Sequence, residues 1–317
     1  MKVPLGEIIA KPQPQQALAF NGERMTSDFG GQTAIEHWHR YLLARELVRG
    51  CDVLDVACGE GYGSALMMQT ARSVVGLDVS ATAVAHAQAS YTAEGLRYEQ
   101  ASALALPLPD ASVDMVVSFE TLEHFTEHDV FLREIKRVLR PNGLLLISTP
   151  DRDTYSPATA PPNPYHKLEL TTAEFLALLQ RHFTSVSSQG QRIMLGSALV
   201  GTAGGATPFC FERRGEGFFE TSPGMARAKY IVALASDQPG RALPDSVYID
   251  TDHLLHFDGR TIEDYIARGI TADLPEVLER TRAEMAHLRA TLDALYASSS
   301  WRLTAPFRRL LKLLRRR

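Results

Sequence analysis

The chain has 317 residues, of which 45% are hydrophobic, so it is long enough for one large domain and an additional segment. Its formal net charge of -4 excludes an overall basic surface for nucleic acid. No signal peptide and no apolar run of transmembrane length are evident, and the three cysteines (Cys51, Cys58 and Cys210) are not spaced as metal ligands. We therefore expect a cytoplasmic protein.

The predicted elements begin after a stretch rich in proline and glutamine. Residues 1–24 have this composition and are expected to form a flexible segment. Residues 25–240 are predicted to form one domain, which opens with a helix over 33–48. Between Glu36 and Tyr41 this helix carries two histidines, a tryptophan and an arginine, a combination that is unusual for a helix with only a packing role.

A glycine turn directly follows the first predicted strand. Gly59 and Gly61 let the backbone bend sharply and let a ligand approach the main chain, at the strand end where open α/β sheets bind nucleotide-like ligands. Asp55 places a negative charge here, which repels a pyrophosphate and attracts an ammonium or sulfonium group. S-adenosylmethionine carries both cations and no phosphate. A second acid, Asp78, ends the next strand and suits the ribose hydroxyls of NAD and S-adenosylmethionine alike.

Strands and helices then alternate, which predicts a doubly wound, mostly parallel α/β sheet. The expected strands are 53–56, 74–78, 96–100, 115–119, 144–148, 185–190 and 230–235. The expected helices among them are 64–71, 81–93 and 127–139, and a capped helix is expected to begin at Thr171. Residues 201–228 interrupt the pattern and are predicted to be a lid-like insertion whose Arg213 and Arg214 can meet a phosphate.

Several of these segments together resemble the class I S-adenosylmethionine-dependent methyltransferases. The segments are Asp55-x-Ala57-x-Gly59-x-Gly61, Gly76-Leu77-Asp78, Leu106-Pro107, 112–118, Leu122-Glu123-His124 and Leu139-Arg140-Pro141-Asn142-Gly143. The resemblance implies the Rossmann-like fold of that class, with S-adenosylmethionine as cofactor. It implies these cofactor-binding residues: Arg40, Tyr41, Asp55, Ala57, Gly59, Gly61, Asp78, Val79, Ser102, Ala103 and Glu120. Ala57 and Ser102 depart from the family pattern, which has a glycine and an adenine-binding acid there.

In such enzymes the segment before the first strand closes over the cofactor. We therefore expect Arg40 or Tyr41 to contact the carboxylate end of the cofactor, and His37 or His39 to face the acceptor. The alternative is an amphipathic helix whose polar residues are solvated.

Two carboxylates and an imidazole follow the fourth predicted strand. His124 is predicted to be a general base for a hydroxyl acceptor, with Glu120 as a further catalytic candidate. A second interpretation is a divalent metal site of Glu120, Glu123 and His124, since Glu-x-x-Glu-His resembles the motif that can bind a metal in quinone-ring O-methyltransferases. In a third, these residues only orient the cofactor loop and cap the next helix.

The loops after the fifth predicted strand resemble those of methyltransferases associated with bacterial surface-polysaccharide (O-antigen) biosynthesis. The similar segments are 148–151 and 163–166. The resemblance implies that Asp151, Asn163, Tyr165 and His166 line a saccharide site, where His166 is a second candidate for the base. The alternatives are a small aromatic or quinone-like acceptor, or a membrane-docked assembly subunit without turnover.

The C-terminal part changes character twice. After a connector over 241–270, residues 271–297 show a heptad seam that predicts a coiled-coil helix and a homo-oligomer. Residues 298–317 interleave arginine and lysine with leucine and aromatic residues. This basic amphipathic tail favours peripheral contact with an anionic membrane, on the inner membrane face, over nucleic acid.

Overall fold

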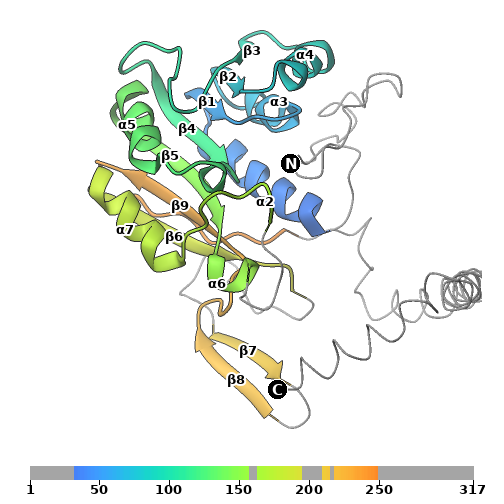
Figure 1. Cartoon of the computed structure of the whole chain (residues 1–317), viewed down its shortest axis with the longest axis vertical. Helices are drawn as coiled ribbons and strands as arrows, with labels where there is room; N and C mark the ends of the chain where they lie inside the picture. The colour runs from blue at the N-terminus through green and yellow to red at the C-terminus, as the bar shows by residue number, and fades with distance from the viewer. Residues whose placement is uncertain (1–31, 157–162, 195–208, 215–217, 249–317) are drawn as a thin grey trace, which may run out of the picture. The chain divides into compact units, whose positions relative to one another are not determined.

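The computed structural model describes residues 32–156, 163–194, 209–214 and 218–248. Within this part of the chain, the core is a seven-stranded sheet of order β3-β2-β1-β4-β5-β9-β6 (Figure 1). The strands are β1 (Asp52–Val56), β2 (Ser73–Asp78), β3 (Leu96–Gln100), β4 (Val113–Phe119), β5 (Leu139–Pro150), β6 (Ser185–Gln191) and β9 (Tyr230–Ser236). The first five strands pair in parallel, and β9 runs antiparallel to both β5 and β6. The predicted mostly parallel, doubly wound sheet is confirmed.

Helices cover both faces of this sheet (Figure 1). They are α2 (Gln32–Leu47), α3 (Tyr62–Met68), α4 (Ala81–Ser90), α5 (His128–Val138) and α7 (Thr172–His182), and the short α6 (Arg152–Tyr155) follows β5. One buried apolar cluster joins α2, α3 and α4 to the sheet, and the other joins α5 and α7 to its opposite face. Because successive strand residues point to opposite faces, Val53 and Leu54 enter different clusters. Strands buried on both faces explain the nearly continuous apolar runs in the sequence.

The start of α7 shows how local chemistry sets an element boundary. The Thr171 hydroxyl accepts a hydrogen bond from the backbone N–H of Glu174 at 3.3 Å, and the Glu174 carboxylate accepts one from the backbone N–H of Thr171 at 2.8 Å. This reciprocal pair satisfies two backbone donors that a helix start leaves without partners. The cap predicted at Thr171 is therefore confirmed.

Part of the predicted insertion has regular structure that the glycine-rich sequence did not indicate. Within 201–228, β7 (Phe209–Arg214) and β8 (Phe218–Pro223) pair as an antiparallel two-stranded sheet. The two segments satisfy each other's backbone hydrogen-bonding groups by this pairing. The side chains of Arg213 and Arg214, expected to meet a phosphate, lie outside the described residues, as do residues 201–208.

Other predictions also fall outside the described residues. They concern the flexible segment 1–24, the connector 241–270 beyond residue 248, the coiled-coil helix 271–297 and the basic tail 298–317. Among the helices that are described, none has both the length and the apolar character needed to cross a membrane.

Candidate active site

The turn after β1 depends on residues with left-handed backbone conformations. Ala57, Gly59 and Gly61 have φ values of 62°, 56° and 95°. A Cβ atom on Gly61 would lie 2.7 Å from the Cβ of Ala87 and 2.9 Å from the ring of Tyr98. Only glycine therefore fits at position 61 without rearrangement, and the turn leaves its backbone at the carboxyl end of β1.

Asp78 ties this turn to the next one. One carboxylate oxygen accepts a hydrogen bond from the backbone N–H of Gly59 at 2.9 Å, and the other accepts one from the backbone N–H of Ser80 at 2.8 Å. Asp78 thus holds the ends of β1 and β2 together. Val79 beside it is 72% exposed. Ser102 and Ala103 follow β3 at the same edge, where the Ser102 hydroxyl accepts a hydrogen bond from the backbone N–H of Leu104.

Asp55 lies deeper than the sequence suggested. Its carboxylate is fully buried and accepts hydrogen bonds from the Ser64 hydroxyl at 2.6 Å and from the Tyr41 hydroxyl at 3.4 Å. Asp55 therefore joins β1 to α2 and α3, and its direct contact with a cofactor cation stays a prediction. Tyr41 was expected to contact the cofactor carboxylate. It is buried, and its hydroxyl points to Asp55. Its ring occupies the space where a Cβ atom on Gly63 would lie.

Burial also gives Asp55 a testable effect on stability. Loss of hydration raises the pKa of Asp55 to about 7, whereas an aspartate in an unfolded chain titrates near 3.9. Between these values the folded state retains a proton that the unfolded state has released. From pH 5 to pH 8, this carboxyl should therefore lower the free energy of unfolding by about 3 kcal/mol. Urea unfolding at pH 5 and pH 8 measures this change. The free energy of unfolding of Asp55→Asn should not fall in this way. An equal pH dependence in the wild type and the variant would contradict the raised pKa of Asp55.

Arg40 is buried at the carboxyl edge of the sheet, and only some of its hydrogen-bond donors have partners. Its Nη1 donates a hydrogen bond to Gln191 at 2.9 Å and lies 3.6 Å from the Glu120 carboxylate, and its guanidinium stacks on the ring of Tyr230 at 4.9 Å. Its Nε and Nη2 are buried and have no hydrogen-bond partner within the described part of the chain. Buried donors without partners are costly, so these two suit an anionic ligand group. His39, by contrast, contacts Ser246.

Glu120 is held by its neighbours at the end of β4. It has a left-handed φ of 50°, and its carboxylate accepts a hydrogen bond from the Ser148 hydroxyl at 2.6 Å. Together with the Arg40 ion pair, this engages one of the carboxylate oxygens. A non-glycine residue in this backbone region is strained, which is common where side chains are positioned for function.

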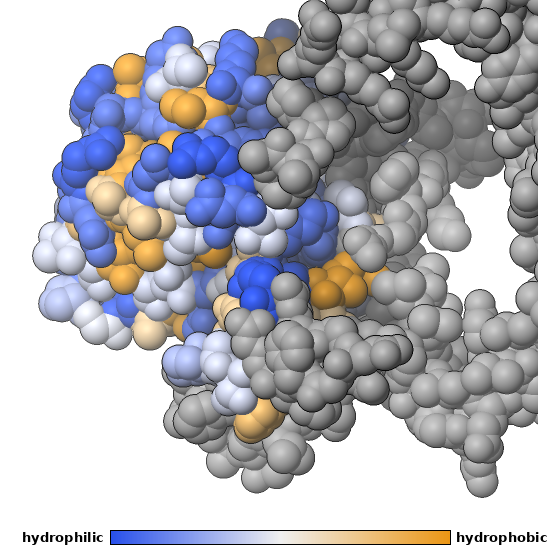
Figure 2. Space-filling model, turned by 60° about the horizontal axis from the view of Figure 1, so that its bottom comes forward, coloured by the Kyte–Doolittle hydropathy of each residue, from blue (hydrophilic) through white to orange (hydrophobic). Residues whose placement is uncertain are grey.

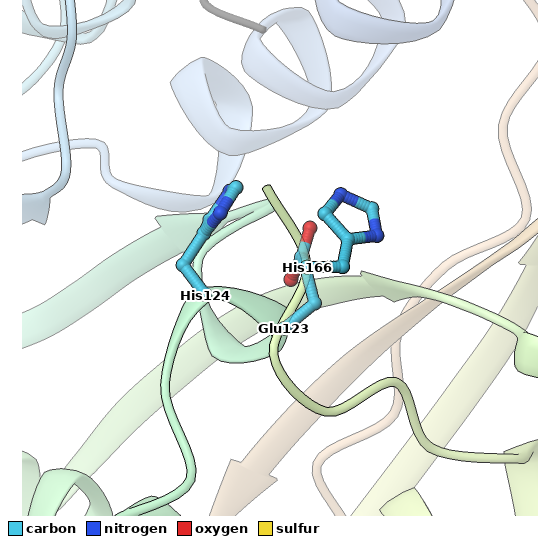
Figure 3. A group of neighbouring side chains, drawn as sticks. All are labelled: Glu123, His124 and His166. Carbon is cyan, nitrogen blue, oxygen red and sulfur yellow. The ribbon is translucent and has the colours of Figure 1, made fainter. Parts of the chain in front are cut away.

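A short 3₁₀ helix, η2 (Leu122–His124), then brings together residues that the sequence keeps apart. The side chains of three residues meet here: Glu123, His124 and His166 (Figure 3). Each offers one possible metal-ligand atom, and these atoms lie within 4.8 Å of one another. Glu123 is buried, and both burial and the nearby Glu120 carboxylate raise its pKa well above the usual value. The sequence-based metal set of Glu120, Glu123 and His124 is not the group found among the described residues. His166 takes the place of Glu120.

The loop that carries His166 is fixed by a residue that sequence analysis missed. His166 Nδ1 lies 2.5 Å from Oε1 of Glu169, and its ring stacks on Tyr155 at 5.4 Å. Asn163 contacts His166 Nε2 at 3.1 Å and accepts a hydrogen bond from the backbone N–H of Tyr165. The signal that could have identified Glu169 is its position three residues after His166.

Asp151, predicted to line the acceptor site, has a structural role in the described residues. Its carboxylate accepts hydrogen bonds from the backbone N–H of Asp153 at 3.2 Å and from the Thr172 hydroxyl at 2.7 Å. It therefore caps α6 and links it to the start of α7. A carboxylate at the start of a helix readily accepts hydrogen bonds from donors of this kind.

Residues 54–147, which carry the turn, Asp78, Glu120 and η2, match the family model described as a methyltransferase domain. Over these residues the chain is similar to methyltransferase domains. The "Probable S-adenosylmethionine-dependent methyltransferase" of Mycolicibacterium smegmatis is 42% identical over 167 residues, which are 52% of this chain and 64% of that protein. A protein of the same description from Mycobacterium tuberculosis H37Rv is 42% identical over 168 residues, 51% of this chain and 60% of that protein. The chain thus spans less than two thirds of these relatives.

A solved structure also aligns with part of this chain. An S-adenosylmethionine-dependent methyltransferase from Mesorhizobium loti aligns with a TM-score of 0.45 and 21% identity, over 65% of this chain and 100% of that one. S-adenosylmethionine is the cofactor of this class. The residues present fit it, because the glycine turn exposes backbone beside Asp78, and the unsatisfied donors of Arg40 suit a carboxylate.

Proposed function

We propose that this protein transfers a methyl group from S-adenosylmethionine to a hydroxyl group of a saccharide, or of a lipid- or nucleotide-linked sugar, in cell-surface glycan biosynthesis. The observation that carries the proposal is the cluster of Glu123, His124 and His166 at the end of β4, at the same sheet edge as the glycine turn and Asp78. Ligands of open α/β sheets bind at this edge.

The cofactor half of the site is assigned to three features. The turn at Gly59 and Gly61 and the Asp78 carboxylate would hold the nucleoside, as the family resemblance implies. The free donors of Arg40 would bind the carboxylate of the methionine moiety, since charge-assisted hydrogen bonds are the strong ones. When bound, the cofactor supplies an electrophilic methyl group on its sulfonium.

The acceptor half is assigned to the imidazole cluster and the loop beside it. Asn163 and His166 offer polar groups, while Tyr165 and Leu168 are 46% and 39% exposed apolar side chains on the same loop. Hydroxyls require hydrogen-bond partners, and the apolar faces of sugar rings pack on aromatic rings. On the face shown in Figure 2, hydrophilic and hydrophobic described residues are interspersed. Orientation of the two reactants would supply much of the rate.

A second candidate is O-methylation of a less polar small molecule, such as an aromatic or quinone-like metabolite. The exposed Tyr165 and Leu168 favour it. A relative named "Fatty-acid O-methyltransferase", from Mycolicibacterium smegmatis, is 34% identical over 122 residues, 38% of this chain and 44% of that protein.

The test is a methyl-transfer assay with S-adenosylmethionine labelled in its methyl group. Sugars, lipid-linked sugars, fatty acids and quinone-like phenols are supplied in parallel to the full chain. We expect label in a sugar hydroxyl. Label confined to phenols or fatty acids would favour the second candidate, and binding of the cofactor without transfer to any class would favour an assembly subunit.

A further inference from the structure

We propose that Glu123, His124 and His166 bind a divalent transition-metal ion. The inference rests on the proposed function, because it concerns the cluster assigned to the acceptor. Figure 3 shows the Glu123 carboxylate between the two imidazole rings, and the candidate ligand atoms lie within 4.8 Å of one another. One carboxylate and two imidazoles form a donor set of zinc and related first-row ions, whereas magnesium and calcium prefer oxygen ligands alone.

Both histidines are oriented as metal ligands are. His124 Nδ1 lies 3.2 Å from the backbone carbonyl of Tyr165, and His166 Nδ1 lies 2.5 Å from the Glu169 carboxylate. A carbonyl or carboxylate oxygen only accepts, so each Nδ1 carries the proton and each Nε2 carries the lone pair. Metal-binding histidines almost always donate their other ring N–H to such an oxygen, which fixes the tautomer and the ring.

The backbone holds the two ligand-bearing segments together. The carbonyl of Glu123 accepts hydrogen bonds from the backbone N–H groups of Lys167 at 2.8 Å and Leu168 at 3.2 Å. The side chain of His166 is 5% exposed, and that of Glu169 is 8% exposed. The cluster is therefore built before any ion arrives, which lowers the cost of ordering it on binding.

Binding an ion requires small changes that can be named. Bonds of about 2.1 Å place two ligands of one ion at most about 4.2 Å apart, so any pair of ligand atoms near the 4.8 Å limit has to move closer together. The ion also replaces the contact of Asn163 with His166 Nε2 at 3.1 Å. Glu120 is not in the group of ligand atoms that lie within 4.8 Å of one another, and Ser148 and Arg40 engage one of its carboxylate oxygens.

Three protein ligands leave coordination positions open, as in catalytic zinc sites. An acceptor hydroxyl bound there would lose its proton more readily, because a bound cation lowers the pKa of a coordinated oxygen. The ion would thus activate the acceptor that the proposed function assigns to this cluster.

The experiment measures metal binding and cofactor binding on the same samples. The full chain is stripped with a chelator and titrated with Zn²⁺ by calorimetry, and with Co²⁺ while its visible absorption is recorded. We expect one Zn²⁺ per chain and a Co²⁺ spectrum. His124→Ala and His166→Ala should each weaken Zn²⁺ binding by more than about 100-fold, and Glu169→Gln by about 10- to 100-fold, as for a residue that orients a ligand. His182→Ala, whose histidine pairs with Asp129, should bind Zn²⁺ as the wild type does.

The other outcomes overturn the metal site, redefine its ligands or reject the proposed function. Binding of S-adenosylmethionine without Zn²⁺ or Co²⁺ binding would reject the metal and leave the methyltransferase proposal intact. Zn²⁺ affinity that survives His166→Ala but not Glu120→Gln would reject this ligand set. If His166→Ala fails to fold, as shown by loss of cofactor binding, His124→Ala decides the question, because its histidine makes fewer contacts. Zn²⁺ binding without cofactor binding would instead reject the proposed function.

Discussion

Asp78→Ala is expected to weaken the binding of S-adenosylmethionine by about 100-fold or more. The Asp78 carboxylate accepts hydrogen bonds from the backbone N–H groups of Gly59 and Ser80, and it is the acid assigned to the ribose. Hydrogen bonds to a charged group contribute about 1.5–3 kcal/mol each, and about 3 kcal/mol corresponds to roughly 100-fold in affinity. Isothermal titration calorimetry on the full chain measures the change directly.

The control is Glu99→Ala on β3. Glu99 pairs only with the exposed Arg97 among the described residues, so cofactor affinity should stay at the wild-type value. Urea unfolding of both variants separates a loss of affinity from a loss of fold. If Asp78→Ala bound the cofactor with wild-type affinity, the assignment of the cofactor site to this edge of the sheet would be wrong. That result would favour the assembly-subunit interpretation.

His124→Ala is expected to lower the rate of methyl transfer by about 100- to 10,000-fold while the affinity for S-adenosylmethionine stays unchanged. The carbonyl of Tyr165 leaves the His124 lone pair on Nε2, which has no hydrogen-bond partner within the described part of the chain. His124 is thus available to the acceptor hydroxyl, directly or through a bound ion. The measurement compares kcat for the wild type and the variant with the acceptor found in the labelling assay.

His182→Ala is the matched control for this second prediction. His182 lies on α7 and pairs with Asp129 on α5, and it is not one of the three clustered residues. Its kcat should equal that of the wild type. An unchanged kcat in His124→Ala would show that acceptor activation does not involve this imidazole.

Much of the fold could be predicted because its signals are local. The strand over 96–100 has the predicted bounds, and most other elements differ from their predictions by a few residues at an end. The cap at Thr171 and Glu174 also followed from the sequence. Apolar runs, glycine turns and capping residues act within a few positions, so they are visible in the chain order. The match of residues 54–147 to a methyltransferase domain agrees with this.

The site was predicted less completely, because its contacts join distant segments. The sequence named Arg40, Glu120, Glu123, His124 and His166, but it did not show which of them meet. Packing of α2 against the sheet places Arg40 between Glu120 and Gln191, which is 151 residues away. It also buries Asp55 and Tyr41, which were expected to contact the cofactor.

The sequence by itself determined the order of strands and helices, the glycine turn and the chemical types at the sheet edge. Only the tertiary structure decided that His166 joins Glu123 and His124, and that Glu169 orients it. It also decided the antiparallel pairing of β7 with β8. The physical reason is that element formation depends on neighbouring residues, whereas side-chain partners depend on how the chain packs in three dimensions.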